Sequence, residues 1–371
     1  LMLMAGASVA YAENMDTIPI NRGDVRPTVM LGVPRFFEKL YMRIQEGIQQ
    51  APTRKRRIVE WAFAVGRATA PSRLTHRPIS PWLWCQEQLA QRLVFHTFHQ
   101  RLGGRLRFFV SGSAPLSKPI AEFFYSAHVI ILEGYGLTET SPVICVNRPG
   151  ALKFGTVGLP INGVDVKLAE DGEILTSGPH VMQGYYRQPG ATQTVIREGW
   201  CHTGDIGTID AEGFVSITDR KKDLIKTAGG KFVAPQKLEG LFLTDPAIAQ
   251  AFVYGDREPY CIALIIPRFE RLADYAKDHG LPSEPQALVQ SSLIRDFLWG
   301  RVQALQQHLP SFEQIKAIAL LDKEFTQAAG ELTPTLKAKR AAIAMRYQAL
   351  IRTLYQQGAQ NNPSVSASSC R

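Results

Sequence analysis

The chain has 371 residues, of which 45% are hydrophobic and 20% are charged, an ordinary composition for a globular enzyme. This length exceeds what one hydrophobic core usually organises, so we expect two or more domains. The formal net charge of +9 suits nucleic acid, anionic lipid or a phosphate-rich ligand, and the lack of any run of about 18–20 apolar residues argues against a membrane-spanning helix.

The cysteines are scattered along the chain without paired spacing. There are five of them: Cys85, Cys145, Cys201, Cys261 and Cys370. Zinc sites and disulfide frameworks need cysteines at recurring spacings, so this scatter argues against both and favours a reducing compartment.

The chain opens on LMLMAGASVAYAEN, an apolar run closed by small residues. Such a run is typical either of the end of a signal peptide or of a buried element in a larger domain. Because no basic residue precedes it and the chain opens on Leu1, we favour a buried element of a domain whose first part lies upstream.

Residues 1–147 alternate short β-branched or aromatic runs with longer amphipathic stretches. The runs PTVMLGV, LRFFVSG and VIILEGYG predict strands, and residues 36–50 predict a helix. This alternation indicates an α/β sheet. Residues 53–81 mix helical, basic and Pro/Arg-rich sequence, so we expect them to be peripheral.

From residue 155 onwards the pattern changes to short strands separated by Gly, Pro and Asp turns. The spacing predicts a small β-barrel-like unit. Beyond residue 222 helices and strands mix again, with AIAQAFVYG and CIALIIP as core strands. We therefore expect an α/β part at 1–154, a β-barrel-like part at 155–220, an α+β domain at 221–358 and a disordered tail at 359–371.

Two loops that follow predicted strands could face a ligand. In FFVSGSAPLS (residues 108–117) small side chains would let a flat ligand approach the backbone, although a tight turn would look the same. In LEGYGLTETSP (residues 132–142) Tyr135 could stack on a purine, Thr138 and Thr140 could bond phosphoryl oxygens, and Glu139 could hold Mg²⁺. The alternative for this second loop is a capped helix start.

Two further segments carry charge beside glycine. In WCHTGDIG (residues 200–207) Asp205 could accept both hydroxyls of a ribose, or it could be a simple turn residue. In ITDRKKDLIKTAGGKFVAPQKLE (residues 217–239) Arg220 and Lys226 supply cations beside Gly229 and Gly230. No interleaved aromatic residues support base stacking there, so nucleic acid is not an expected partner.

Taken in order with GELTPTLKAKR (residues 330–340), these segments resemble the adenylate-forming superfamily, and within it the long-chain fatty acid–CoA ligases. The resemblance also includes VAYAENMDTIP and VRPTVMLGVPRFFEKLY, so it covers nearly the whole chain. It implies the C-terminal part of a large α/β AMP-binding domain, a mixed sheet with helices plus a small β-barrel subdomain, followed by a smaller mobile α+β lid domain.

The resemblance implies two half-reactions at one site: a carboxylate attacks the α-phosphate of ATP to give an acyl-adenylate, and coenzyme A then displaces AMP. Thr138 would touch the α-phosphate, Glu139 would bind Mg²⁺, and Lys337 would be the catalytic lysine. The remaining residues implied to bind cofactors are Ser113, Ala114, Pro115, Gly134, Tyr135, Gly136, Asp205, Arg220, Lys226, Gly229 and Gly230.

Specific roles follow from motif position. Tyr135 would stack on adenine, Asp205 and Arg220 would hold the ribose, and Lys222 would be the hinge about which the domain carrying Lys337 moves. Lys226, Gly229 and Gly230 would line the coenzyme A face. Ser113 stands where long-chain ligases often carry glycine, and Cys201 where they usually carry a bulky apolar residue.

Such ligases carry a Ser/Thr/Gly-rich phosphate loop upstream of all these motifs, and no such run occurs here. We therefore expect this chain by itself to be catalytically poor and prone to aggregate. Two alternatives stay open, transfer of the acyl group to an acyl carrier protein and a catalytically inactive remnant. The resemblance implies a cytoplasmic protein that takes a fatty acid substrate and contacts the inner face of the membrane peripherally.

Overall fold

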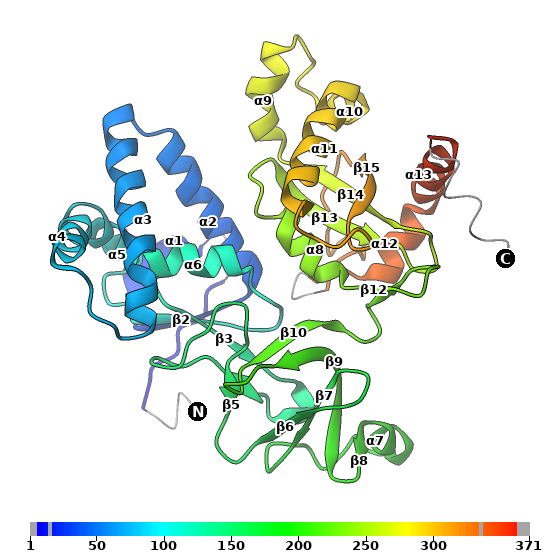
Figure 1. Ribbon diagram of the computed structural model, residues 1–371, viewed down its shortest axis with the longest axis horizontal. Coiled ribbons are helices and arrows are strands. Elements are labelled where there is room, and N and C mark those ends of the chain that lie inside the picture. The colour runs from blue at the N-terminus through cyan, green and yellow to red at the C-terminus, as the bar shows by residue number, and fades with distance from the viewer. Residues whose placement is uncertain (1–5, 14–16, 334–336, 362–371) are drawn as a thin grey trace. The chain divides into compact units, whose positions relative to one another are not determined.

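The computed structural model describes residues 6–13, 17–333 and 337–361. The chain divides into two compact units (Figure 1). Unit 1 comprises Leu1–Val166, Ser177–Pro189 and Ile209–Ser216, and unit 2 comprises Lys167–Thr176, Gly190–Thr208 and Ile217–Arg371.

A five-stranded sheet in the order β1-β2-β3-β4-β5 forms the centre of unit 1. The pairs β1–β2 and β2–β3 are parallel, and the pairs β3–β4 and β4–β5 are antiparallel. Their bounds are β1 Val29–Gly32, β2 Phe108–Ser111, β3 Ile131–Tyr135, β4 Cys145–Val146 and β5 Leu159–Pro160. The three strands predicted from apolar runs in this part of the chain are confirmed.

Helices cover this sheet and bury an aromatic core. The Phe37 ring lies 5.3 Å from that of Phe109 and 6.4 Å from that of Phe124, and all three side chains are fully buried. The predicted helix at residues 36–50 is confirmed as α2. The helices are α1 Ile18–Val25, α2 Pro34–Gln49, α3 Thr53–Leu74, α4 Pro81–Ala90, the π-helix η1 Gln91–Phe95, α5 His96–Arg101, α6 Lys118–Ser126 and the 3-10 helix η2 Thr138–Thr140.

The expectation that residues 53–81 are peripheral is wrong. Most of the segment is α3, whose Phe63 is 4% exposed and stacks on Phe123 at 4.5 Å between ring centroids. A Cβ added to Gly66 would lie 2.0 Å from the Ser126 carbonyl oxygen, so α3 packs tightly on α6. The basic run at its start hid the apolar stripe, and Pro71 falls only in its last turn.

The expectation of a buried element at the N-terminus is also not met, because residues 6–13 are exposed. The first five residues lie outside the described part of the chain.

A second sheet, in the order β10-β9-β7-β6 with β8 paired to β9, follows along the chain, and both β7 and β8 are antiparallel to β9. Most of its residues belong to unit 2. Its elements are β6 Asp165–Leu168, β7 Glu173–Ser177, α7 Pro189–Val195, β8 Ile196–Arg197, β9 Trp200–Ile209 and β10 Val215–Arg220. The short strands predicted from the frequent turns of this segment are confirmed. That they close into a barrel-like unit stays a prediction.

The rest of unit 2 is built on a three-stranded sheet, β13-β14-β15, in which every residue of β14 is buried. Both predicted core strands, β13 and β14, are confirmed. The elements are β11 Ile225–Lys226, β12 Phe232–Val233, α8 Pro235–Phe242, β13 Ile248–Tyr254, β14 Cys261–Pro267, α9 Phe269–Asp278, α10 Pro285–Gln290, α11 Ser292–Gln306, β15 Ile315–Leu320, α12 Arg340–Arg346 and α13 Gln348–Asn361.

The fold is therefore α/β with mixed sheets, as predicted. Residues 359–361, expected in the disordered tail, belong to α13, and residues 362–371 lie outside the described part. Within the described residues we find no helix whose length and hydropathy would let it cross a bilayer.

Candidate active site

The predicted ligand loops of unit 1 lie together at one edge of its sheet. β2 and β3 are parallel and in register, with Ser111 opposite Glu133, so the loops that leave them start side by side. A Cβ added to Gly112 would lie 3.8 Å from the Gly134 carbonyl oxygen. The carboxyl edge of parallel strands is where open α/β sheets bind ligands. The structure thus brings the loop of Ser113, Ala114 and Pro115 next to Gly134.

Ser113 has a backbone conformation that normally requires glycine. Its φ is +73°, in the left-handed region, and its side chain is exposed. A Cβ in this region clashes with the backbone at a cost of about 1–2 kcal/mol. Ser113, which stands where long-chain ligases often carry glycine, therefore strains the backbone of this loop.

Glu133 ties the two loops together. It is 7% exposed within β3, and one carboxyl oxygen accepts a hydrogen bond at 3.2 Å from the backbone N–H of Leu116. Burial raises the pKa of this carboxyl to about 7, and the single hydrogen bond offsets this only in part. The sequence analysis assigns no role to Glu133. The signal that could have identified it is an acidic residue in the middle of an apolar strand.

The segment after β3 is held by close backbone packing. A Cβ added to Gly136 would lie 1.6 Å from the Pro142 carbonyl oxygen, so only glycine fits. The preceding Tyr135 is 8% exposed, and its carbonyl oxygen accepts a hydrogen bond from the Ile144 N–H at 2.8 Å. These contacts fix the path of the loop that carries Thr138 and Glu139.

Thr138 and Glu139 lie in η2, a single 3-10 turn. The Thr140 hydroxyl accepts a hydrogen bond from the Leu137 N–H at 2.9 Å, so this threonine stabilises the turn from within. Thr138 is exposed. The Glu139 carboxylate accepts a hydrogen bond at 2.7 Å from the hydroxyl of Tyr185, a residue that sequence reasoning missed.

Asp205 and Arg220 form an ion pair in unit 2. Asp205 lies in β9 and Arg220 ends the neighbouring strand β10, and the Arg220 Nε is 3.4 Å from the Asp205 Oδ1. Asp205 is 4% exposed, whereas the arginine side chain remains 39% exposed. The pair therefore has one anchored and one accessible member.

Glu173 holds both sides of this ion pair in place. Its carboxylate accepts hydrogen bonds from the Gly204 N–H at 2.9 Å and from the Lys221 Nζ at 3.0 Å. Gly204 immediately precedes Asp205 in the sequence, and Lys221 immediately follows Arg220. Burial opposes ionisation of Glu173, but these hydrogen bonds outweigh it and lower the pKa of the carboxyl. The partners lie 31 and 48 residues along the chain, which explains why sequence reasoning missed this residue.

Lys337 lies near this ion pair, also in unit 2. Burial lowers the pKa of its amine, the positive charge of Arg220 lowers it further, and Asp205 and Asp223 oppose the shift. Its backbone is fixed by Thr333, which donates its N–H to the Lys337 carbonyl at 2.8 Å and accepts from the Lys337 N–H through its hydroxyl at 3.0 Å. The intervening residues 334–336 of this motif lie outside the described part of the chain.

Two buried carboxylates anchor the segment on either side of Lys337. Glu331, 2% exposed, accepts a hydrogen bond from the Thr326 N–H at 3.0 Å and lies 3.3 Å from the Arg346 guanidinium. Glu239 pairs with Arg340 at 2.8 Å, and burial raises the pKa of the Glu239 carboxyl. Sequence reasoning assigned no role to either carboxylate.

Lys226, Gly229 and Gly230 are placed in a separate hairpin of β11 and β12. Gly230 has a φ of +73° and donates its N–H to the Thr227 carbonyl at 2.8 Å, which closes the turn. Lys226 is exposed, with its Nζ 5.6 Å from the centre of the Phe232 ring. Lys222 is exposed in the turn directly after β10.

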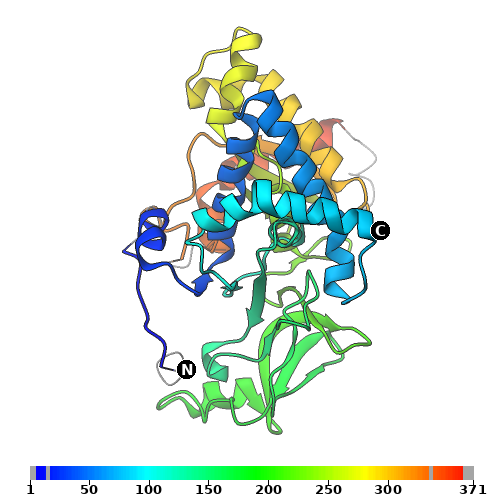
Figure 2. The ribbon, with the colours of Figure 1, turned by 90° about the vertical axis from the view of Figure 1, so that its left-hand side faces the viewer.

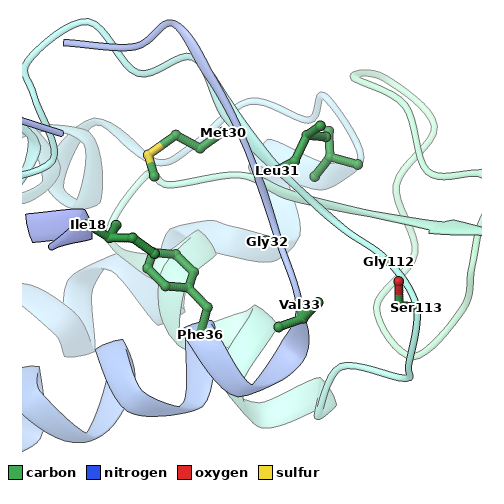
Figure 3. A pocket seen from close by; sticks show the side chains of 9 residues that line it. Ile18, Met30, Leu31, Gly32, Val33, Phe36, Gly112 and Ser113 are labelled. Atoms are coloured by element: carbon green, nitrogen blue, oxygen red, sulfur yellow. The ribbon is translucent and has the colours of Figure 1, made fainter. Parts of the chain in front are cut away.

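An apolar pocket of about 460 Å³ opens beside the Ser113 loop in unit 1. Figure 3 shows Ile18 and Phe36 next to one another, with Met30 nearby and Ser113 at the opposite end. The volume lies within the usual range for small-molecule sites. The full lining is Ile18, Met30, Leu31, Gly32, Val33, Phe36, Val110, Gly112 and Ser113.

Within the described residues, no three His, Cys, Asp or Glu side chains gather closely enough to hold a metal ion by themselves. Glu139 nevertheless offers a partly exposed carboxylate oriented by Tyr185. Mg²⁺ is usually held by one or two carboxylates together with substrate phosphates, so this donor set fits magnesium.

Comparisons with known proteins show which family the chain belongs to. A family model of AMP-binding enzymes matches residues 1–186, and one of the AMP-binding enzyme C-terminal domain matches residues 222–359. The long-chain-fatty-acid–CoA ligase FadD15 of Mycobacterium bovis is 36% identical over 353 residues, which cover 89% of this chain and 55% of that protein. The putative fatty-acid–CoA ligase fadD11 of Mycobacterium tuberculosis is 35% identical over 359 residues, covering 96% and 63%.

A solved structure shares the fold. The adenylation and carrier didomain of the carboxylic acid reductase from Segniliparus rugosus, in complex with AMP, has a TM-score of 0.69 at 24% identity, covering 96% of this chain and 45% of that one. This chain thus spans between about half and two thirds of the length of the curated relatives described above. Both family models, one on each side of the Asp205–Arg220 segment, lead to one conclusion. The chain belongs to the AMP-binding enzyme family.

Proposed function

We propose that this chain serves ATP-dependent activation of a long-chain fatty acid and transfer of the acyl group to coenzyme A, giving acyl-CoA, AMP and pyrophosphate. The observation that carries the proposal is the position of Lys337 near the Asp205–Arg220 ion pair within unit 2. A guanidinium paired with a buried carboxylate, with an amine near them, suits a nucleotide, because ribose hydroxyls donate hydrogen bonds to the carboxylate and phosphate oxygens accept them from the cations. The curated relatives named as fatty-acid–CoA ligases support the substrate class.

In the adenylation step a fatty-acid carboxylate oxygen attacks the α-phosphorus, and the bond to the pyrophosphate oxygen breaks. Lys337 would stabilise the negative charge that builds on the α-phosphoryl oxygens, because a preorganised cation in a half-buried site is worth most at that point. Asp205 and Arg220 would hold the ribose hydroxyls so that the phosphate meets the lysine.

The unit 1 loops would receive the adenine and the α-phosphate. Tyr135 would lie against the adenine. The backbone of Gly134, of Gly136 and of the loop of Ser113, Ala114 and Pro115 would approach the adenine closely from the sides. Thr138, exposed in η2, would bond the α-phosphate, and Glu139 would hold Mg²⁺, which supplies charge neutralisation of the phosphates when bound.

In the second step the coenzyme A thiol loses its proton to water and its sulfur attacks the acyl carbon, the bond from that carbon to the phosphate oxygen breaks, and AMP leaves with the electron pair. Lys226, Gly229 and Gly230 would line the face that meets coenzyme A, and Lys222 would be the hinge that exchanges one step for the other. The apolar pocket beside Ser113 would hold part of the acyl chain, since its lining is aliphatic and aromatic. We place the protein in the cytoplasm, where both anionic cosubstrates are present.

The test supplies a long-chain acyl-adenylate to the purified chain and follows thioester formation with coenzyme A and with acyl carrier protein as alternative acceptors. We expect acyl-CoA to form and acyl carrier protein to react far more slowly. Efficient acylation of the carrier protein would favour the alternative acceptor. A chain that forms no thioester and shows no saturable heat with a stable acyl-adenylate analogue in calorimetry would be an inactive remnant.

A further inference from the structure

Tyr185 lies outside the motifs found in the sequence, yet it contacts the residue proposed to hold magnesium. Its hydroxyl donates a hydrogen bond at 2.7 Å to Oε1 of Glu139, which lies 46 residues earlier in the chain. This distance is that of a charge-assisted hydrogen bond, in which a hydroxyl and a carboxylate oxygen lie about 2.5–2.7 Å apart. Both segments belong to unit 1 and can be followed in Figure 2, η2 in blue-green and residues 177–189 in green.

The segment that carries Tyr185 holds Glu139 at two points. Besides the hydroxyl contact, the backbone N–H of Met182 donates a hydrogen bond at 2.8 Å to the Glu139 carbonyl oxygen. This backbone bond already joins the segment to η2. The tyrosine hydroxyl is therefore not needed to attach the segment, and its contact acts on the direction of the Glu139 carboxylate.

The direction of this carboxylate matters for a magnesium ligand. Glu139 is half-buried in a single 3-10 turn, where a side chain with several rotatable bonds would otherwise sample many orientations. Mg²⁺ demands near-ideal octahedral geometry, which one oxygen of a carboxylate satisfies better than both oxygens together. A hydrogen bond to one oxygen selects one orientation. Removing such an outer partner of a metal ligand typically costs about 10–100-fold in metal affinity.

We propose that Tyr185 is a positioning residue for magnesium binding: its hydroxyl fixes Oε1 of Glu139, so that the carboxylate is oriented for the metal before the nucleotide arrives. The inference rests on the proposed function, in which Glu139 holds Mg²⁺ beside the phosphates, and it makes the affinity for ATP with Mg²⁺ depend on a hydroxyl that acts only through Glu139. The adjacent Tyr186 supplies a matched comparison, because it is 82% exposed and its ring lies 5.1 Å from the Arg187 guanidinium carbon.

Calorimetry of the purified protein with ATP, once in Mg²⁺ and once in EDTA, tests the inference. We expect wild type to bind ATP more tightly in Mg²⁺. Tyr185→Phe keeps the ring but loses the hydroxyl, and it should weaken ATP binding in Mg²⁺ about tenfold while leaving the affinities for ATP in EDTA and for AMP unchanged. Tyr186→Phe should match wild type in all three measurements.

A double-mutant cycle shows whether Tyr185 acts through Glu139. Glu139→Gln keeps an acceptor for the tyrosine hydroxyl but carries no negative charge for the metal, so it should abolish the gain in ATP affinity that Mg²⁺ gives. In the Glu139→Gln background, Tyr185→Phe should then change ATP affinity in Mg²⁺ by less than about twofold, because the two residues are coupled. A full additional tenfold loss would mean that the hydroxyl acts elsewhere, and it would overturn the inference.

Two results for Tyr185→Phe would overturn this inference alone. One is a wild-type gain in ATP affinity from Mg²⁺. The other is an equal loss for ATP in Mg²⁺, ATP in EDTA and AMP, which would show that the hydroxyl supports the fold rather than the metal ligand. Wild-type ATP binding that does not respond to Mg²⁺ would instead refute the magnesium role of Glu139, and the inference would fall with it. None of these measurements contains a fatty acid or coenzyme A, so they are independent of the acyl-transfer test of the proposed function.

Discussion

The candidate ligand-binding residues of unit 1 and those of unit 2 are held in place in different ways. In unit 1 the loops after β2 and β3 are shaped by backbone geometry: Gly136 packs against a carbonyl oxygen, Ser113 is held in the left-handed region, and Glu133 is buried with a raised pKa. In unit 2 the geometry is set by charge, with Asp205 and Arg220 paired and Glu173 bound to their neighbours. Substitutions that change the size or backbone freedom of a side chain should therefore affect unit 1 most, and substitutions that remove a charge should affect unit 2 most.

The largest expected effect comes from adding one methyl group in unit 1. Gly136→Ala places a carbon 1.6 Å from the Pro142 carbonyl oxygen, and the loop backbone must move. We expect a loss of about 3 kcal/mol or more in the free energy of unfolding, measured by urea denaturation. Gly47→Ala in α2 is the control, since its new Cβ would meet no atom within 4 Å, and it should stabilise the chain by about 0.5–1 kcal/mol.

A smaller effect should appear as a dependence on pH. The pKa of Glu133 is raised from 4.5 to about 7 in the folded chain, so the unfolded state ionises first as the pH rises. Stability should therefore fall between about pH 5 and pH 7, by up to about 3 kcal/mol, through this one group. Glu133→Gln keeps an acceptor for the Leu116 N–H and should remove that fall.

Measurement of urea midpoints from pH 5 to pH 8 tests this, with Glu122→Gln, an exposed residue of α6, as control. Asp219, whose pKa burial raises to about 6, titrates in both proteins, so the difference between wild type and variant isolates Glu133. Parallel curves for the two proteins would contradict the prediction.

In unit 2 the loss of one charge should weaken nucleotide binding. Glu173→Gln keeps the size of the side chain but loses the charged hydrogen bonds to the Gly204 N–H and the Lys221 Nζ, which position Asp205 and Arg220. We expect AMP affinity, measured by calorimetry, to fall about tenfold, as for a charge-assisted hydrogen bond. Glu170→Gln, on an exposed position of the same hairpin, should bind AMP like wild type. Equal affinity of both variants would remove Glu173 from the positioning role.

The smallest effect should be a gain in stability. Ser113→Gly relieves a φ of +73° at an exposed residue, which should raise the free energy of unfolding by about 0.5–1 kcal/mol after the entropy of glycine in the unfolded state is counted. Ser72→Gly inside α3 should change stability in the opposite direction by a similar amount. Thermal unfolding of both variants gives the comparison, and a destabilised Ser113→Gly would show that the loop carries no backbone strain there.

Sequence reasoning was most successful where local pattern decides structure. The apolar runs of β1, β2, β3, β13 and β14 are bounded by turn residues, and the strands lie where these runs predict. The prediction for α3 was wrong. Four basic residues at its start and Pro71 near its end are typical of an exposed segment, and the apolar side that packs on α6 is recognised only in the folded structure.

The candidate site was found from ordered motifs, but its supporting residues were not. Glu173 acts on partners 31 and 48 residues away, and Tyr185 reaches Glu139 across 46 residues. No spacing in a single sequence reveals such pairs, since they depend on how strands align. The roles of the motif residues themselves stay predictions.

The central claim is that Lys337, beside Asp205 and Arg220, serves adenylation alone. Lys337→Ala is made in the protein, and the two half-reactions are measured separately, as fatty-acid-dependent ATP–pyrophosphate exchange and as acyl-CoA formation from supplied acyl-adenylate. We predict that exchange falls at least about a hundredfold while acyl transfer is retained, and that Lys339→Ala, an exposed neighbour, changes neither. Unchanged exchange in the Lys337 variant would contradict the account.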